Sequence, residues 1–126
     1  MAVTPHDLVV EAKAQIKEVG TADAQALLGK CVIIDVREYD EYAAGHLPGA
    51  INIPRGVLEF KIGMVPECAN KDDSLLIYCR TSGRAALSAL QLQKIGYVDV
   101  TSIFGGFEAW DAEGRPTEKP EPINFE

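Results

Sequence analysis

The sequence predicts an α/β fold in which an open, mostly parallel sheet carries helices on both faces. Segments rich in β-branched residues alternate along the chain with stretches of helical periodicity, an order typical of parallel sheets with helical crossovers. The segment 31–36, Cys-Val-Ile-Ile-Asp-Val, is a β-branched run rather than an alternating one, which indicates a central strand covered on both faces. The 126 residues, 47% of them hydrophobic and 25% charged, fit one domain with one core.

Capping residues and breakers predict the helices. Thr4 and Pro5 are typical of a helix start. The apolar face of this first helix comprises Leu8, Ala12, Ile16 and Val19. Thr21 as N-cap and Gly29 as a left-handed residue after the last turn bracket a second helix. Further helices are predicted at 38–42, near 57–62, between the loop after residue 79 and residue 95, and at 107–113.

Between these helices, strands are predicted at 31–36, 50–53, 74–78 and 97–103. The helix that ends at residue 95 is apolar except for a stripe formed by Arg84, Ser88, Gln91 and Lys94, so we expect only this narrow face to meet water. Along the whole chain, three segments are predicted: an N-terminal helix packed on the domain (1–20), the domain itself (21–114), and an extended C-terminal tail with three prolines (115–126).

Charge and cysteine usage exclude several classes of function. The formal net charge of −7 disfavours nucleic acid and anionic lipid surfaces as partners. No run approaches the ~18 apolar residues of a membrane span, and the first residues do not resemble a secretion signal. The three cysteines are odd in number and form no C-x-x-C motif, which disfavours a disulfide framework and a zinc site. We therefore expect a cytoplasmic protein with no metal and no cofactor.

Cys79 is the candidate nucleophile. It directly follows the strand 74–78, at the sheet edge where open parallel sheets bind ligands. The small residues Thr81, Ser82 and Gly83 allow a tight loop whose backbone N–H groups point inward, beside the N-terminus of the next helix. Such a site stabilises a thiolate, the reactive form of cysteine. The alternative interpretation is a small buried apolar residue at a strand end.

The remaining candidates have open interpretations. Arg80 and Arg84 either lie solvated on the surface or fold back over the loop to hold an anion. Cys68 lacks a neighbouring cation or glycine loop, so we do not expect a resolving thiol or a second reactive thiol there. Cys31 opens a buried strand, where an inert thiol is expected. His6 and His46 share no ligand spacing with the cysteines, which disfavours metal binding.

Three ordered motifs within residues 21–114 resemble the rhodanese family of sulfurtransferases. The segment 42–53 contains the aromatic residue, spacer and His-Leu-Pro-Gly-Ala of the family's first signature, and Asp35-Val36-Arg37 precedes it. The segment 105–110 is similar to the second signature in its glycine pair and tryptophan. It departs from that signature at Phe104, where an acidic residue is usual, and at Ala109, where glutamate often stands. The resemblance implies the family's five-stranded sheet.

The resemblance also implies a chemistry. Cys79 would take sulfane sulfur from a small anionic donor such as thiosulfate as a persulfide and pass it to cyanide, a thiol or a sulfur-accepting protein. Residues 80–84 (Arg80, Thr81, Ser82, Gly83 and Arg84) would bind the substrate anion. Asp35 and Arg37 would support the site through a salt bridge, and His46 would be a structural residue of the signature turn.

Two other functions compete with this interpretation. A phosphatase or arsenate reductase would also use a cysteine, N–H groups and an arginine for a tetrahedral oxyanion. However, four residues separate Cys79 from Arg84, whereas the phosphatase-like relatives of the family have five, and the shorter loop favours the smaller sulfur atom. The other alternative is a persulfide carrier or docking module with weak turnover. The donor, the acceptor and the oligomeric state stay open at this point.

Overall fold

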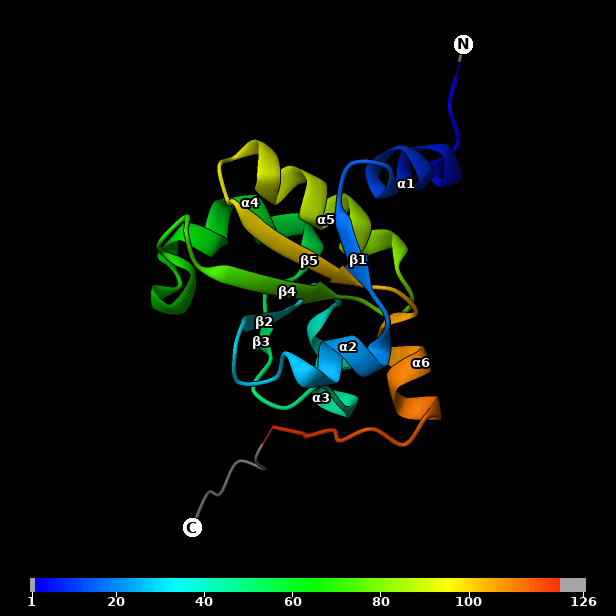
Figure 1. The fold of residues 1–126 in the computed structure, drawn as a ribbon, viewed down its shortest axis with the longest axis vertical. Coiled ribbons are helices and arrows are strands. Elements are labelled where there is room, and N and C mark those ends of the chain that lie inside the picture. The colour runs from blue at the N-terminus through cyan, green and yellow to red at the C-terminus, as the bar shows by residue number, and fades with distance from the viewer. Residues whose placement is uncertain (1, 121–126) are drawn as a thin grey trace.

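The computed structural model describes residues 2–120 and confirms the predicted α/β class. Its five strands form one sheet in the order β1-β5-β4-β2-β3, and every neighbouring pair is parallel. The strands are β1 (Lys17–Val19), β2 (Val32–Asp35), β3 (Ile51–Asn52), β4 (Ser74–Tyr78) and β5 (Asp99–Ile103). Figure 1 shows β4 and β5 crossing the middle of the molecule. The sheet is therefore wholly parallel rather than mostly parallel.

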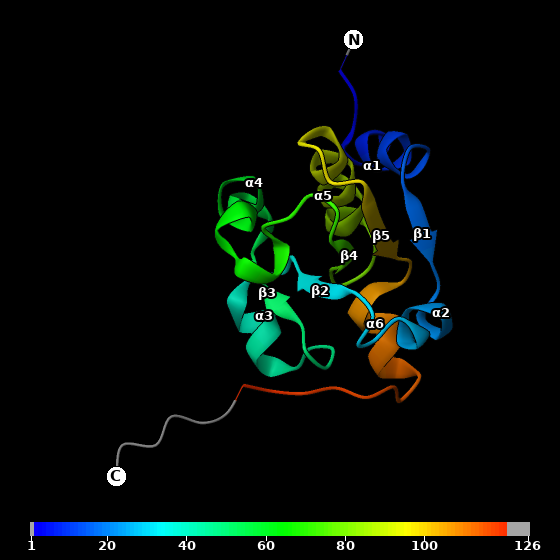
Figure 2. The same ribbon diagram turned by 60° about the vertical axis from the view of Figure 1, so that its left-hand side comes forward.

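Helices cover both faces of this sheet (Figure 2). The α-helices are α1 (Pro5–Lys13), α2 (Thr21–Ala26), α3 (Tyr39–Ala44), α4 (Leu58–Lys61), α5 (Gly83–Lys94) and α6 (Gly106–Ala112), and three short 3₁₀ turns occupy Arg55–Val57, Ile62–Met64 and Pro66–Cys68. Helices α1, α4 and α5 lie on one side of the sheet, and α2, α3 and α6 lie on the other. Within residues 2–120, none of the helices combines the length and the apolarity that a membrane crossing requires.

The central strand β4 divides the core into two clusters. Leu75 and Ile77 face the side of α4 and α5, whereas Leu76 and Tyr78 face the side of α2 and α6. All four side chains are at most 1% exposed. Burial on both faces explains why this strand is a continuous apolar run, and it fixes the direction in which the chain leaves the sheet after Tyr78.

The predicted first helix is too long. Helix α1 ends at Lys13, and residues 17–19 form the edge strand β1, paired in register with residues 101–103 of β5. The backbone groups of this segment are satisfied by a strand 84 positions further on, and such a long-range pairing outweighs the local helical spacing of Ile16 and Val19. Thr21 is likewise not an N-cap: it is the first residue of α2, and its hydroxyl donates to Glu113, the C-cap residue of α6.

The predicted polar stripe of α5 is wrong at Ser88. Its side chain is fully buried, and its hydroxyl donates to the Arg84 carbonyl at 2.7 Å. Helix α1 packs against α5 and covers part of the surface that the sequence pattern assigned to water. A small hydroxyl that satisfies itself within its own helix is well suited to such a helix contact.

The segment 115–120 runs in an extended conformation along the domain. The backbone of Glu118 forms an antiparallel bridge with that of His46, and the Trp110 indole N–H donates to the Pro116 carbonyl at 2.7 Å. These contacts anchor the start of the predicted tail next to α3 and α6 (Figure 1). The rest of that predicted tail, 121–126, lies outside the described residues.

Candidate active site

Cys79 lies where β4 ends, and residues 79–84, the Cys79 loop, connect it to α5. Its side chain is 1% exposed and belongs to the core cluster on the α5 side. The Sγ atom accepts a hydrogen bond from the backbone N–H of Ala85, 3.3 Å away, in the first turn of α5. The sulfur therefore occupies the position at a helix N-terminus where negative charge is stabilised.

The N-terminus of α6 orients the Cys79 loop. The N–H groups of Phe107 and Glu108 donate to the carbonyls of Cys79 and Arg80, both at 2.9 Å. In a trans peptide the carbonyl and the following N–H point in opposite directions, so the next two N–H groups, those of residues 80 and 81, are directed away from α6. Among residues 2–120, no acceptor receives the N–H groups of residues 80–84. The loop thus presents a set of free donors, the N–H cradle, to a bound anion.

Gly106 makes this arrangement possible. A Cβ at this position would lie 2.2 Å from the Thr81 carbonyl oxygen, 2.5 Å from that of Cys79 and 2.8 Å from that of Arg80. Its φ of +55° is also left-handed. Only a residue without a side chain brings the two backbones this close, so the second residue of the glycine pair at 105–106 has a specific role in positioning the loop.

Arg84 forms a two-pronged ion pair with Glu41 on α3, at 2.8 and 3.0 Å. These hydrogen bonds lower the pKa of Glu41 from 4.5 to about 2, against the opposite effect of partial burial. They also raise the pKa of Arg84, and the nearby Cys79 and Asp35 add smaller contributions in the same direction. The guanidinium is therefore held beside the loop by a carboxylate of this chain.

Arg80 points to the surface. Its side chain is 70% exposed, and its Nε donates to Glu108 at 3.2 Å. Each arginine of the Cys79 loop is thus engaged by a carboxylate in this structure, and the donors left free in the loop are backbone N–H groups. The assignment of Arg80 and Arg84 to substrate binding stays a prediction.

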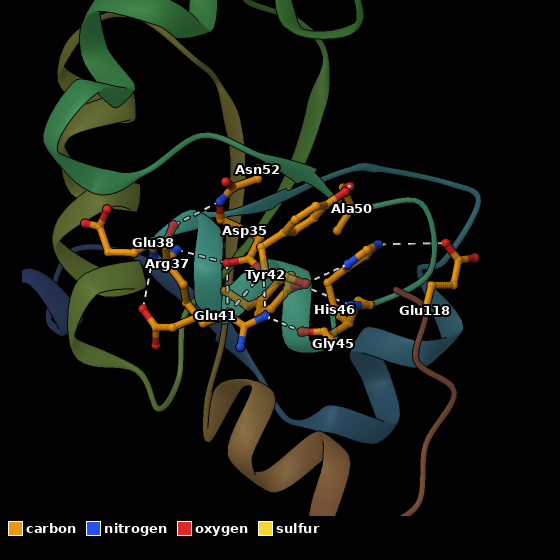
Figure 3. A network of polar contacts seen from close by, with 12 residues as sticks. Asp35, Arg37, Glu38, Glu41, Tyr42, Gly45, His46, Ala50, Asn52 and Glu118 are labelled. Atoms are coloured by element: carbon orange, nitrogen blue, oxygen red, sulfur yellow. Dashed lines mark hydrogen bonds and ion pairs between the residues drawn. The ribbon is translucent and has the colours of Figure 1, made fainter. Parts of the chain in front are cut away.

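Asp35 and Arg37 form a buried network close to α3 (Figure 3). Nε and Nη2 of Arg37 bind the Asp35 carboxylate, with the shortest distance 2.7 Å, and Nη2 also donates to the Gly45 carbonyl. Burial disfavours the charge of Arg37, but the hydrogen bonds and charge of Asp35 outweigh burial and raise its pKa. The Tyr78 hydroxyl donates to Asp35 at 2.7 Å. Burial, and to a lesser degree the charge of Asp35, raises the pKa of Tyr78. This network joins the ends of β2 and β4 to the turn after α3.

His46 lies at the far side of this network, next to the bridge with Glu118 (Figure 3). Its ring stacks on Tyr42 with a centroid distance of 3.8 Å, and its Nδ1 lies 3.0 Å from the Tyr42 carbonyl oxygen. The Tyr42 hydroxyl in turn donates to the Ala50 carbonyl. These contacts hold the signature turn together, in keeping with the structural role expected for His46.

A cleft of about 520 Å³ opens between α3, the Cys79 loop and α6. Its lining includes Arg37, Glu41, Arg80, Phe107, Glu108 and Asp111. Both carboxylates that pair with the loop arginines belong to this lining. A molecule that approaches the loop from the cleft therefore meets paired charges of both signs and the ring of Phe107.

The other two cysteines lie in different surroundings. Cys68 is fully buried in the core cluster under α4, and burial followed by the charges of Glu67 and Asp73 raises its pKa to about 11. Burial also raises the pKa of Cys31. Among residues 2–120, no three His, Cys, Asp or Glu side chains gather as metal ligands.

Sequence reasoning missed three groups that contact the loop: Glu41, the N–H groups at the start of α6, and Lys13 of α1. Glu41 and Arg84 are 43 positions apart, and neither residue carries a local signal for the pairing. The α6 contact had a partial signal in the glycine pair at 105–106. Lys13, whose Nζ donates to Ser82 Oγ at 2.8 Å, belongs to a helix predicted only to pack on the domain.

Comparisons with known proteins place this chain in a family. The model of the rhodanese-like domain family matches residues 20–113. The thiosulfate sulfurtransferase GlpE of Coxiella burnetii is 32% identical over 103 residues, covering 80% of this chain and 92% of its own. The putative sulfur carrier protein YrkF of Bacillus subtilis is 32% identical over 78 residues, covering 62% of this chain and 40% of its own. A solved structure from Rhodopseudomonas palustris, described as a protein of unknown function and possible tyrosine phosphatase, has a TM-score of 0.83 at 32% identity, covering 94% of this chain and 96% of its own.

The close approach at Gly106 gives a prediction for stability. We expect Gly106→Ala to lower the free energy of unfolding by roughly 3 kcal/mol or more, because the new methyl group meets three carbonyl oxygens. Gly114→Ala is the matched control: its φ is +71° but nothing lies within 4 Å, so we expect only the left-handed strain of about 1 kcal/mol. Urea denaturation measures both. Equal losses would show that α6 and the loop do not pack as described.

The Glu41–Arg84 pair gives a prediction for pH dependence. The pKa of Glu41 is about 2 in the folded protein, against 4.5 for an unperturbed glutamate such as that of the unfolded chain. The ionised carboxylate therefore stabilises the fold fully above pH 4.5, and this contribution falls as the pH drops toward 2. The stability difference between the wild type and Glu41→Gln should therefore be larger at pH 7 than at pH 3 in urea titrations. Glu67→Gln, at an exposed glutamate outside the ion pairs of residues 2–120, is the control and should show no such change. A difference between wild type and Glu41→Gln that does not change with pH would contradict the ion pair.

Proposed function

The chain belongs to the rhodanese-like domain family, and we propose that it is a sulfurtransferase that carries sulfane sulfur on Cys79 from a small anionic donor such as thiosulfate to a thiol or cyanide. The observation that carries the proposal is the position of the Cys79 sulfur at the start of α5, where it accepts a hydrogen bond from the Ala85 N–H. The N–H groups of residues 80–84, in the same loop, have no acceptor among residues 2–120. Donors fixed in place before the reaction stabilise an anion without reorganisation.

The proposed reaction has two transfers. The Cys79 thiolate attacks the outer sulfur of thiosulfate, a new S–S bond forms, and sulfite leaves with the electron pair of the bond that breaks. The terminal sulfur of the resulting persulfide carries the negative charge. Cyanide or a thiolate then attacks that sulfur, and the Cys79 thiolate leaves, so that the enzyme returns to its first state. Atoms and charges balance in both steps with no external oxidant or reductant.

The N–H cradle is assigned to the persulfide. A terminal sulfur anion on Cys79 extends from a side chain that is already 1% exposed, so it has to be accommodated within the loop. There the N–H groups of residues 80–84 supply donors that no other group uses among residues 2–120. Hydrogen bonds to charged groups contribute about 1.5–3 kcal/mol each, so a few of them are enough to hold the anion in a protein of net charge −7.

The arginines and the buried pair have supporting roles in this proposal. Arg84 is fixed beside the loop by Glu41, so in this proposal it meets a donor anion as one half of an ion pair. Asp35 and Arg37 hold the turn after α3, and Gly45 of that turn lines the cleft. The cleft then provides the route by which the acceptor reaches the loop.

A sulfur carrier is the second candidate, and the likeness to the putative carrier YrkF supports it. The site is the same in both cases, because a carrier also holds sulfur on Cys79. The difference is that a carrier releases sulfur to a protein partner and turns over thiosulfate slowly. The two candidates therefore differ in turnover and agree in loading.

Sulfur loading gives the first test of the proposal. After incubation with thiosulfate and removal of excess donor, the intact mass of the wild type should rise by about 32 Da, the mass of one sulfur atom. Cys79→Ala should show no increase. Cys68→Ser should load like the wild type. The Cys68 thiol that it removes is buried, and its pKa is raised to about 11, so little of it is present as the reactive thiolate. Loading of Cys79→Ala would contradict the assignment of the nucleophile.

Turnover separates the candidates. We expect thiosulfate and cyanide to give thiocyanate with the wild type, and at least a 10³-fold lower rate with Cys79→Ala, since removal of a covalent nucleophile leaves little catalysis. Loading without turnover would favour the carrier. Hydrolysis of p-nitrophenyl phosphate without sulfur loading would instead support a phosphatase, in line with the description of the R. palustris protein. The same preparations serve all three assays, so the outcomes are directly comparable.

A further inference from the structure

Helix α1 lies outside the segment 20–113 that matches the family model, yet it contacts the Cys79 loop. Lys13, the last residue of α1, places its Nζ 2.8 Å from Ser82 Oγ. A Cβ added to Gly83 would lie 3.5 Å from a Val9 methyl group, so α1 also packs directly over the loop. Two independent contacts thus connect this additional helix to the residues around the nucleophile.

Ser82 is an unusual helix start. It is the N-cap of α5, where a serine normally adopts an extended backbone and its Oγ accepts an N–H of the first helical turn. Here its backbone has φ −147° and ψ −12°, and its side chain forms no capping hydrogen bond. The N–H of Ala85, the third residue of the helix and a usual partner of a capping hydroxyl, donates to Cys79 Sγ instead. The hydroxyl of Ser82 is held by Lys13 outside the loop.

Lys13 is itself fixed by its neighbours. Glu18 of β1 lies 3.4 Å from Nζ, and the ring of Phe104 lies beneath the ammonium at 4.8 Å from its centroid. Its side chain is 25% exposed, so the ammonium is partly shielded from water. A cation held by a carboxylate, a ring and a hydroxyl has little freedom to leave Ser82.

We propose that Lys13 is a positioning residue of the active site: by binding the Ser82 hydroxyl it prevents Ser82 from capping α5 and so leaves the Ala85 N–H to the Cys79 sulfur. This inference rests on the proposed function and deepens it, since it assigns to α1 a part in stabilising the reactive thiolate. Without Lys13, Ser82 is free to return to the ordinary N-cap conformation. Its Oγ then competes with Cys79 Sγ for the same N–H.

A double-mutant cycle tests this competition. The readout is the rate at which iodoacetamide alkylates Cys79 at neutral pH, followed on the peptide that contains Cys79. We expect Lys13→Met to slow alkylation about tenfold, the effect of losing one hydrogen bond to an anion. In the Ser82→Ala background no hydroxyl competes for the Ala85 N–H, so there Lys13→Met should change the rate less than twofold.

Two outcomes would overturn the inference. If Lys13→Met slows alkylation equally with and without the Ser82 hydroxyl, Lys13 acts through its charge or through packing, and not through Ser82. If Lys13→Met leaves the rate unchanged in the Ser82 protein, Lys13 has no part in positioning the loop. Lys17→Met is the matched control. Lys17 lies on the edge strand β1 and pairs with Asp99 of β5, so its substitution should not alter the alkylation rate. Thermal denaturation of each variant verifies that it is folded at the assay temperature.

Sulfur loading from thiosulfate, measured on the same variants, keeps this inference separate from the proposed function. A wild type that loads sulfur while the cycle shows no coupling would refute the role of Lys13 and leave the sulfurtransferase proposal intact. A wild type that takes up no sulfur while the cycle shows coupling would refute the proposed function and leave the role of Lys13 in place. Alkylation requires the thiolate and access of iodoacetamide to it, but no sulfur donor, so the two readouts do not depend on each other.

Discussion

The backbone contact between α6 and the Cys79 loop is the constraint on which the site depends. Two N–H groups of α6 bind the carbonyls of Cys79 and Arg80, and Gly106 lets the backbones approach closely enough for this. Once those carbonyls face α6, planar trans peptides direct the neighbouring N–H groups to the opposite side of the loop, away from α6. The helix that follows β5 therefore determines the direction of the peptide groups in the loop after the neighbouring strand β4. No side-chain charge is required for this orientation.

This constraint also addresses the electrostatic difficulty that the proposed function raises, namely an acidic protein that would act on anions. The chain carries a net charge of −7, and Arg84 and Arg80 are paired with Glu41 and Glu108. Backbone N–H groups and the start of α5 are fixed dipoles that carry no counter-charge and need no reorganisation. They can hold a sulfur anion while the paired arginines keep the local field from becoming strongly negative. The paired charges also give the lining of the cleft both signs of charge.

The sequence was sufficient for features that local patterns encode and insufficient for those that only the folded chain creates. The parallel sheet, the turn after β4 and the position of Cys79 follow from apolar runs, small residues and the rules for open sheets, and the structure agrees with them. Strand β1 was mistaken for helix because its partner is β5. Ser88 was mistaken for a surface residue because its burial depends on what packs against α5, which its own segment does not encode. The partners of Arg84 and Ser82 are 43 and 69 positions away, and nothing in either segment indicates them.

The Ser82 conformation shows why local rules fail at this point of the chain. A capping serine contributes about 1 kcal/mol to a helix, and here that contribution is absent while the helix N–H is directed at a sulfur atom. A residue that does not form the hydrogen bond its type usually forms is typical of a functional site. There the lost contribution to the stability of the fold is compensated by other contacts. The contacts of Lys13 with Ser82, Glu18 and Phe104 are the compensation that this structure offers. They also explain why a helix outside the family segment packs against the loop: it stabilises a conformation that the loop's own sequence does not favour.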